Sequence, residues 1–497
     1  MEKAIRQACL HVIFLATVLS ACASTPNLIY QLPAAPAPTP DIAIQPAPAL
    51  LVGLAVSGGG SRAATFAAGA MDALARLQQA PGQASVLDQV NYISSVSGGS
   101  LASAYYVLNA PPKTNVNTPS PAELSDFFKH FKVAMQEDYE RPALLRQAAT
   151  MRGINSSAAA RSMADVWDQS IFHDFTFGML AARERDAPTP HLVLNGTRWN
   201  DGHRFIFTTL PLREFEPSFS KGLMATLENS SKLPLEERTL LRAQLIEAYD
   251  QFRTISFENM GGPNVPGADF NALPVSLAVV ASASVPGALG PVSFTIAGQP
   301  INHHIGDGGL FDNQGIESLI ELFLNKLSVD APGGVRRRAL IIMIDASFPF
   351  DAAKAELDKA ISPLKVLSID PFRVQSMMEQ RALAYQLALW SVLRTESASF
   401  VPDTNQLRIV HLHHTDAEWS GGYADLPPEC HGEFTQDVTN EQIKARLARI
   451  PTLFRLASPC DGPLLLKAAQ LVVTQQAPRI TEFFSNAPNL INAGTPH

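Results

Sequence analysis

Short apolar runs alternate with helical patterns in the first part of the chain. Leu50–Val56 is a continuous apolar run of strand length, and Ala63–Leu77 repeats small and apolar side chains at helical spacing. A second, β-branched run begins at Val90, and Leu101–Leu108 has a helical pattern again. Strand, helix, strand and helix in this order predict a mostly parallel sheet with helices on both faces.

Two later stretches also have the character of strands. Arg338–Ile344 is a nearly continuous apolar run, and Leu407–His413 alternates enough to predict a peripheral strand. Residues 213–264 are predicted to be an insertion, with an amphipathic helix that begins near Pro234. This helix either covers a site or packs on the surface of the core, and we favour the second arrangement. A long helix is predicted over Pro371–Leu393.

The N-terminal residues have the pattern of an export signal. A short basic region precedes the apolar run Ala8–Leu19, which is too short for a comfortable membrane span. The run ends in Leu19-Ser20-Ala21-Cys22, which resembles the lipobox of bacterial lipoproteins. The resemblance implies that residues 1–21 are a signal peptide and that lipid is attached to Cys22. An ordinary signal peptide is the alternative. Because residue 23 is alanine rather than aspartate, the expected location is the outer membrane of a bacterial cell envelope.

The composition predicts a tether after the export signal and argues against nucleic acid as a partner. Prolines recur among alanines in residues 22–49, which predicts an extended tether rather than a packed element. The 497 residues carry a formal net charge of −8, so there is no electrostatic case for nucleic-acid binding. In an exported protein we expect Cys430 and Cys460 to form a disulfide, with unpaired buried thiols as the alternative.

A serine with reactive surroundings lies where the second predicted strand gives way to a helix. Ser95-Val96-Ser97-Gly98-Gly99 matches the nucleophile elbow G-x-S-x-G except that Ser95 replaces the first glycine. Ser97 would stand on a sharp turn, in front of the unpaired N–H groups of the following helix. Such groups can stabilise a tetrahedral oxyanion. If position 95 requires a positive φ, a serine there would carry ~1–3 kcal/mol of strain.

A glycine-rich turn, Ser57-Gly58-Gly59-Gly60-Ser61-Arg62, follows the first predicted strand. It lacks the lysine of a phosphate-binding loop. It also has Ala63 where a dinucleotide-binding turn has its last glycine, and the next strand end carries no acid. The remaining use is a row of backbone N–H groups directed at a reacting carbonyl oxygen. Arg62 either orients this turn or attracts a phosphate or carboxylate headgroup.

Three motifs, taken in order, resemble the patatin-like phospholipase family, including its cytosolic phospholipase A branch. They are SGGGSRA at 57–63, SVSGG at 95–99 and Asp-Gly-Gly at 307–309, with support from Leu192–Thr197, Val280–Pro286 and Asn313. The resemblance implies an α/β three-layer sandwich with a mostly parallel central sheet over residues 50–347. A helical C-terminal extension, 348–497, would pack on this core. Ser95 and Ala63 depart from the family pattern.

The resemblance also implies a reaction and the residues that perform it. A lipid acyl hydrolase of this family would use a Ser–Asp dyad, with Ser97 as nucleophile and Asp307 as base. The oxyanion hole would consist of N–H groups of Gly58, Gly59, Gly60 and Gly98. Membrane lipids would be the substrate, and the chemistry requires no metal or other cofactor.

Three alternatives remain open. One is a Ser-His-Asp triad that draws on His303, His304, His411, His413 or His414. Another is a metal site at His411, His413, His414 and Asp416, although we favour the interpretation that these are ordinary polar residues of the surface. The third is a lipid-binding envelope protein without catalytic activity.

Overall fold

The computed structural model describes eleven stretches of the chain. They are residues 29–35, 48–78, 83–111, 120–150, 156–215, 234–262, 265–285, 289–327, 331, 334–347 and 407–485. The predicted signal peptide, Cys22 and the predicted helix at Pro371–Leu393 lie outside the described residues.

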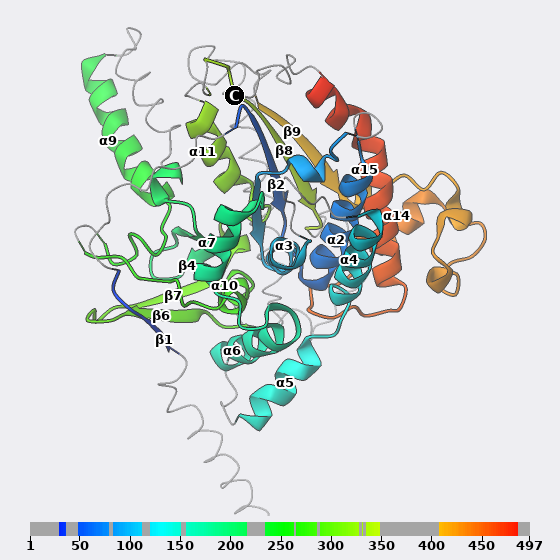
Figure 1. Ribbon diagram of the computed structural model, residues 1–497, viewed down its shortest axis with the longest axis horizontal. Coiled ribbons are helices and arrows are strands. Elements are labelled where there is room, and N and C mark those ends of the chain that lie inside the picture. Colours follow the sequence, from blue (N-terminus) through cyan, green and yellow to red (C-terminus); the bar gives the residue numbers. More distant parts are fainter. Residues whose placement is uncertain are drawn as a thin grey trace, which may run out of the picture.

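A nine-stranded sheet forms the centre of the described structure (Figure 1). Its order is β1-β6-β7-β4-β3-β2-β8-β9, and β5 pairs with β4 beside this path. The five strands from β4 to β9 in this order run parallel, whereas β7 is antiparallel to both β4 and β6. The bounds are β1 Ile29–Leu32, β2 Leu50–Val56, β3 Tyr92–Val96, β4 His191–Arg198, β5 Arg204–Thr208, β6 Val292–Ile296, β7 Asn302–Asp307, β8 Arg338–Asp345 and β9 Leu407–His413.

Helices cover both faces of the sheet, which confirms the predicted three-layer α/β fold. In β2, Val52 and Leu54 belong to the larger core, which includes side chains of α2, Gly60–Arg76. Leu51 and Ala55 alternate with them and face α11, Ile316–Leu327. Because both faces of β2 are buried, the strand is apolar throughout instead of alternating with polar residues.

The other described helices surround these layers. Phe127, Phe128 and Phe131 of α4 are buried, and Phe131 stacks on Tyr105 with ring centroids 4.8 Å apart. The bounds are α3 Gly98–Asn109, α4 Pro121–Ala134, α5 Glu140–Ala149, α6 Ser156–Trp167, α7 Phe177–Asp186, α9 Leu235–Phe252, α10 Val275–Ser282, α14 Asn440–Ala448 and α15 Asp461–Ser485.

The C-terminal part of the chain packs directly on the central layers. β9 pairs with β8 along its full length, from Leu407 to His413. Helix α15 lies against α2, as Figure 1 shows in red and blue. The two helices approach closely at Gly69, where an added Cβ would lie 2.9 Å from the Cβ of Ala469. A helix pair this close excludes larger side chains at the contact.

Part of the predicted tether belongs to the sheet. Ile29–Leu32 forms β1 and pairs in parallel with β6, so the prediction of an unpacked tether is wrong for these residues. Leu32 is buried, and the Tyr30 ring packs edge-on against Phe294. The alternation of Ile29, Tyr30, Gln31 and Leu32 was the signal for a strand, and the prolines that follow it obscured that signal.

Helix α9 forms near the predicted start. Leu240 is 60% exposed and Leu241 is 37% exposed. These two leucines therefore do not pack on the core, contrary to the surface arrangement that we favoured. Among the described residues, none of the helices combines the length and the apolar character that a membrane crossing requires.

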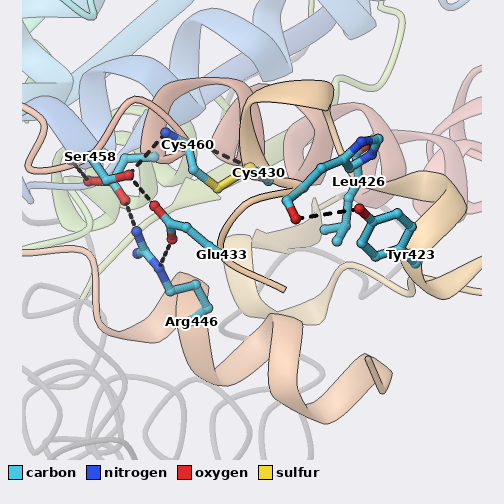
Figure 2. Close-up of a disulfide and its surroundings, with 9 residues drawn as sticks. Tyr423, Leu426, Cys430, Glu433, Arg446, Ser458 and Cys460 are labelled. Atoms are coloured by element: carbon cyan, nitrogen blue, oxygen red, sulfur yellow. Dashed lines mark hydrogen bonds and ion pairs between the residues drawn. A yellow bond between two sulfur atoms is a disulfide. The ribbon is translucent and has the colours of Figure 1, made fainter. Parts of the chain in front are cut away.

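A disulfide links Cys430 to Cys460, with Cα atoms 4.7 Å apart (Figure 2). It joins a short turn after β9 to the start of α15. Beside it, Glu433 accepts hydrogen bonds from Arg446, at 2.9 Å, and from Ser458. Arg446 also reaches the buried carboxylate of Asp461 at 2.6 Å. The link and these ion pairs fix the two ends of the segment that contains α14.

Candidate active site

Ser97 occupies the turn between β3 and α3 with a backbone conformation that is rare for serine. Its φ is 53° and its ψ is −122°. Residues other than glycine adopt such angles only where the surrounding structure imposes them, and this is common at functional sites. Ser95 lies within β3, and its φ is not positive. The strain considered for Ser95 is therefore absent there and is located on Ser97 itself.

The two glycines after Ser97 allow the elbow to meet the glycine-rich turn. A Cβ added to Gly98 would lie 2.0 Å from the carbonyl oxygen of Gly60. A Cβ added to Gly99 would lie 2.5 Å from the carbonyl oxygen of Ser57. β2 and β3 are parallel neighbours, so both turns leave the same edge of the sheet. The sequence prediction that the two turns share one site is consistent with this contact.

The N–H groups of the glycine-rich turn do not all face the same way. Gly58 N–H donates to the carbonyl oxygen of Asn313 at 2.9 Å, so this predicted oxyanion donor is already engaged. Gly59 and Gly60 have φ values of 141° and 59°. Within the described part of the chain, no acceptor is assigned to their N–H groups or to that of Gly98. These three N–H groups are candidate donors to an oxyanion, and Gly60 also lines the cavity beside Ser97.

Arg62 is buried at the end of the glycine-rich turn and fixes it to two other segments of the chain. Its Nε donates to Ala346 O at 2.7 Å, and its Nη1 donates to Ile450 O at 2.6 Å. Only 1% of the residue is exposed. These contacts favour the orienting role considered for Arg62, and they leave its guanidinium with no surface for a substrate headgroup.

Strand register brings Asp307 to the elbow. β3 ends with Val96 opposite Asn195 of β4. The next residue of β4, Gly196, lies opposite Asp307 at the end of β7. Asp307 therefore lies on the far side of β4 at the level where the chain turns away into Ser97. Gly308 makes this approach feasible, because a Cβ there would lie 2.4 Å from the carbonyl oxygen of Asn195.

The Asp307 carboxylate is buried, with one oxygen held and the other free. Oδ1 accepts from Gly309 N–H at 2.6 Å. Burial raises the pKa of Asp307 from 3.8 to about 7, although the Gly309 hydrogen bond and the Ser97 hydroxyl act to lower it. Oδ2 makes no hydrogen bond of ordinary geometry to a described residue, and the Ser97 hydroxyl acts on it as a close neighbour without an aligned bond. Catalytic hydrogen bonds are often poorly aligned until the substrate binds.

Ser97 also lines an apolar cavity of about 240 Å³. Its walls come from α5, α6, the segment after α10 and residues 452–454, and they include Met163, Leu289 and Phe454. Leu453 of this wall touches the glycine-rich turn directly, since its carbonyl oxygen accepts from Ser61 N–H at 2.7 Å. Sequence reasoning missed this wall, because no local motif marks residues 452–454.

Two of the histidines considered for a triad have other partners, and none of the five lines the cavity. The described wall of the cavity contains no histidine. His304 pairs with Ser293 at 2.8 Å, and His411 pairs with Asp345 at 3.0 Å. Burial lowers the pKa of His411, but the hydrogen bond and charge of Asp345 outweigh this and raise it. β9 is three strands away from β3, about 14 Å at the usual strand spacing.

The metal site considered at the end of β9 is not formed by the described residues. His411 contacts Asp345, whereas His413 contacts Thr415 at 2.8 Å and His414 is buried. Across the residues with described positions, no group of three or more His, Cys, Asp or Glu side chains is arranged to hold a metal ion.

Comparisons with known proteins place the chain in a family. A search of curated protein sequences finds no match. Among solved structures, human GIVD cytosolic phospholipase A2 in complex with methyl γ-linolenyl fluorophosphonate is similar, with 15% identity and a TM-score of 0.43. A second structure, with terbium chloride also present, has 14% identity and a TM-score of 0.42. Both alignments cover 88% of this chain and 59% of the other.

A family model described as patatin-like phospholipase matches residues 54–320. The matched segment contains Ser97, Asp307 and the glycine-rich turn, and it is more than half of the 497-residue chain. The chain therefore belongs to the patatin-like phospholipase family, and this membership supports lipid acyl hydrolase activity at the level of the family.

Proposed function

We propose that this protein hydrolyses carboxylic esters of lipids through an acyl-enzyme formed on Ser97. The observation that carries the proposal is the juxtaposition of a strained serine, which lines an apolar cavity, with a buried carboxylate. A serine hydroxyl is a poor nucleophile unless a base takes its proton. Asp307 is the candidate base, because its carboxylate interacts with the Ser97 hydroxyl.

The reaction begins with a proton transfer. Oδ2 of Asp307 accepts the Ser97 proton while Oγ of Ser97 forms a bond to the ester carbonyl carbon. The N–H groups of Gly59, Gly60 and Gly98 donate to the resulting oxyanion. The bond to the alcohol then breaks, and Asp307 returns the proton to the departing oxygen. Water attacks the acyl-enzyme by the same steps and releases the fatty acid.

The cavity beside Ser97 suits a single acyl chain. Pockets that enclose a drug-sized ligand are typically ~300–1,000 Å³, so 240 Å³ is too small for a whole two-chain lipid. Leu144 and Leu145 of α5 offer a matched test, because they are 66% and 64% exposed and only Leu144 lines the cavity. Leu144→Ala should lower kcat/KM for long-chain esters several-fold, whereas Leu145→Ala should leave it unchanged.

A fluorophosphonate probe tests the chemistry directly, because it reacts with an activated serine. The wild-type protein should be labelled and should release fatty acid from phospholipid or glyceride vesicles, whereas Ser97→Ala should do neither. Asp307→Asn should lose nearly all labelling, and His411→Ala should keep it. A histidine variant that is inactive beside an active Asp307→Asn would refute the dyad. A wild-type protein without labelling, even in detergent, would favour the lipid-binding alternative.

We further propose that Cys22 carries a lipid anchor and that the protein acts in the bacterial cell envelope, at the outer membrane. The support is the lipobox-like Leu19-Ser20-Ala21-Cys22 and the alanine that follows it. Mass spectrometry of protein purified from bacterial membranes should find a diacylglycerol-modified N-terminal Cys22, and Cys22→Ala should shift the protein to the soluble fraction. An unmodified cysteine would refute the anchor.

A further inference from the structure

The end of α10 contacts both proposed reactive residues. Ser282 Oγ accepts a hydrogen bond from Ser97 N–H at 3.0 Å. Two residues later, the carbonyl oxygen of Ser284 accepts from Asp307 N–H at 2.9 Å. One short stretch of chain, from Ser282 to Ser284, therefore fixes the backbone of the nucleophile and the backbone of the base relative to each other.

Ser282 is itself held in a single orientation. Its residue is fully buried, and its hydroxyl donates to the carbonyl oxygen of Asn195 at 2.5 Å. Ser100 Oγ lies 2.9 Å from the Ser282 hydroxyl oxygen. A hydroxyl can donate one hydrogen bond and accept two, so these contacts with Asn195, Ser97 and Ser100 use its full capacity. A side chain bound in this way cannot rotate without breaking buried hydrogen bonds.

The φ of 53° at Ser97 requires such a constraint. Strained backbone angles persist only where neighbouring groups impose them. Gly98 and Gly99 press against the glycine-rich turn on one side of the elbow. On the other side, the Ser282 hydroxyl holds the Ser97 N–H. The same bond removes the Ser97 N–H from the donors that could reach a substrate oxyanion.

We infer that Ser282 is a positioning residue for the proposed hydrolysis: its hydroxyl holds Ser97 in the strained conformation that aims Oγ at the substrate and at Asp307. This inference rests on the proposed function. Ser282 contacts neither the substrate cavity nor the Asp307 carboxylate, so it acts only through Ser97. Its loss should slow bond formation at Ser97 without weakening the binding of the acyl chain.

A matched pair of variants in the full chain tests the inference. Ser282→Ala removes the hydroxyl that holds Ser97. Ser162→Ala in α6 removes an equally buried hydroxyl that donates to Ala158 O at 2.9 Å and lies outside the reactive turns. The measurements are the rate constant of fluorophosphonate labelling, kcat and KM on a vesicle substrate, and the melting temperature.

Ser282→Ala should lower kcat and the labelling rate about tenfold to hundredfold, with KM within about twofold of wild type. Ser162→Ala should match wild type in both rates. Ser282→Cys keeps the shape of the side chain with a weak donor and acceptor on a larger atom, so it should give intermediate rates and provides a second variant if Ser282→Ala is unstable.

Equal rates for Ser282→Ala and wild type would overturn the inference and leave the proposed hydrolysis intact. Equal losses in the Ser282 and Ser162 variants would also overturn it, because they would show a general packing effect. A wild-type protein that neither reacts with the probe nor hydrolyses ester would overturn both proposals together.

Discussion

Replacement of Asp307 by asparagine should stabilise the folded chain, and the gain should grow with pH. The folded protein keeps the Asp307 proton up to about pH 7, whereas the unfolded chain loses it near 3.8. Between these values the folded state binds more protons than the unfolded state, so this group lowers stability as pH rises through the window. Asparagine resembles the protonated carboxyl and has no such dependence.

The size of the effect follows from the separation of the two pKa values, which is about 3. The raised pKa of Asp307 lowers the free energy of unfolding by about 4 kcal/mol at pH 8 and by about 1.6 kcal/mol at pH 5. The stability difference between Asp307→Asn and wild type should therefore widen by about 2.5 kcal/mol over this range. The figure needs no reduction for solvent screening, because only 1% of Asp307 is exposed.

Urea unfolding of both proteins at pH 5 and pH 8 measures the difference, provided that the dependence on denaturant is the same in each. Asp186→Asn is the control, since Asp186 has a side chain that is 69% exposed. A difference between Asp307→Asn and wild type that stays constant from pH 5 to pH 8 would refute the reasoning. It would mean that solvent reaches the carboxylate and that its pKa is close to the ordinary one.

Three further predictions follow from the site and its supports. Because Asp307 must be ionised to act as a base, kcat/KM should rise about tenfold per pH unit below pH 7 and level off above it, and a flat profile would count against this role. Gly98→Ala should reduce labelling by at least about a hundredfold, since its Cβ would lie 2.0 Å from a carbonyl oxygen, whereas Gly432→Ala, with no atom within 4 Å, should behave as wild type. Replacing Cys430 and Cys460 by serine should cost about 3–4 kcal/mol of unfolding free energy, from a separation of 30 residues, and an unchanged urea midpoint would contradict the contribution of the link.

Local sequence patterns predicted the central layers and the reactive turn. The apolar run Leu50–Val56 and the glycines around Ser97 favour strand and turn through their own conformational preferences, so local patterns were enough to locate them. The elbow motif also identified Ser97. It suggested backbone strain at Ser95, whereas the positive φ belongs to Ser97. The motif indicates that a sharp turn is present, and the angles of its members depend on how the neighbouring strands end.

Contacts between distant residues could not be predicted from the sequence. The engagement of Gly58 N–H by Asn313 and the burial of Arg62 against Ile450 join residues more than 250 positions apart. Ser282 lies in a small-residue segment whose composition indicates close packing and does not reveal what it packs against. Such contacts arise only when the sheet order brings separate strand ends together.

Residues 452–454 line the cavity but lie far along the chain from the proposed catalytic residues, so substrate fit and chemistry depend on different segments. The proposed chemical groups lie within residues 54–320, whereas this wall lies more than 130 residues beyond that segment. Substitutions at Leu453 or Phe454 can therefore change which acyl chains fit without altering Ser97 or Asp307. The family segment alone contains the proposed nucleophile and only part of the wall that would select an acyl chain.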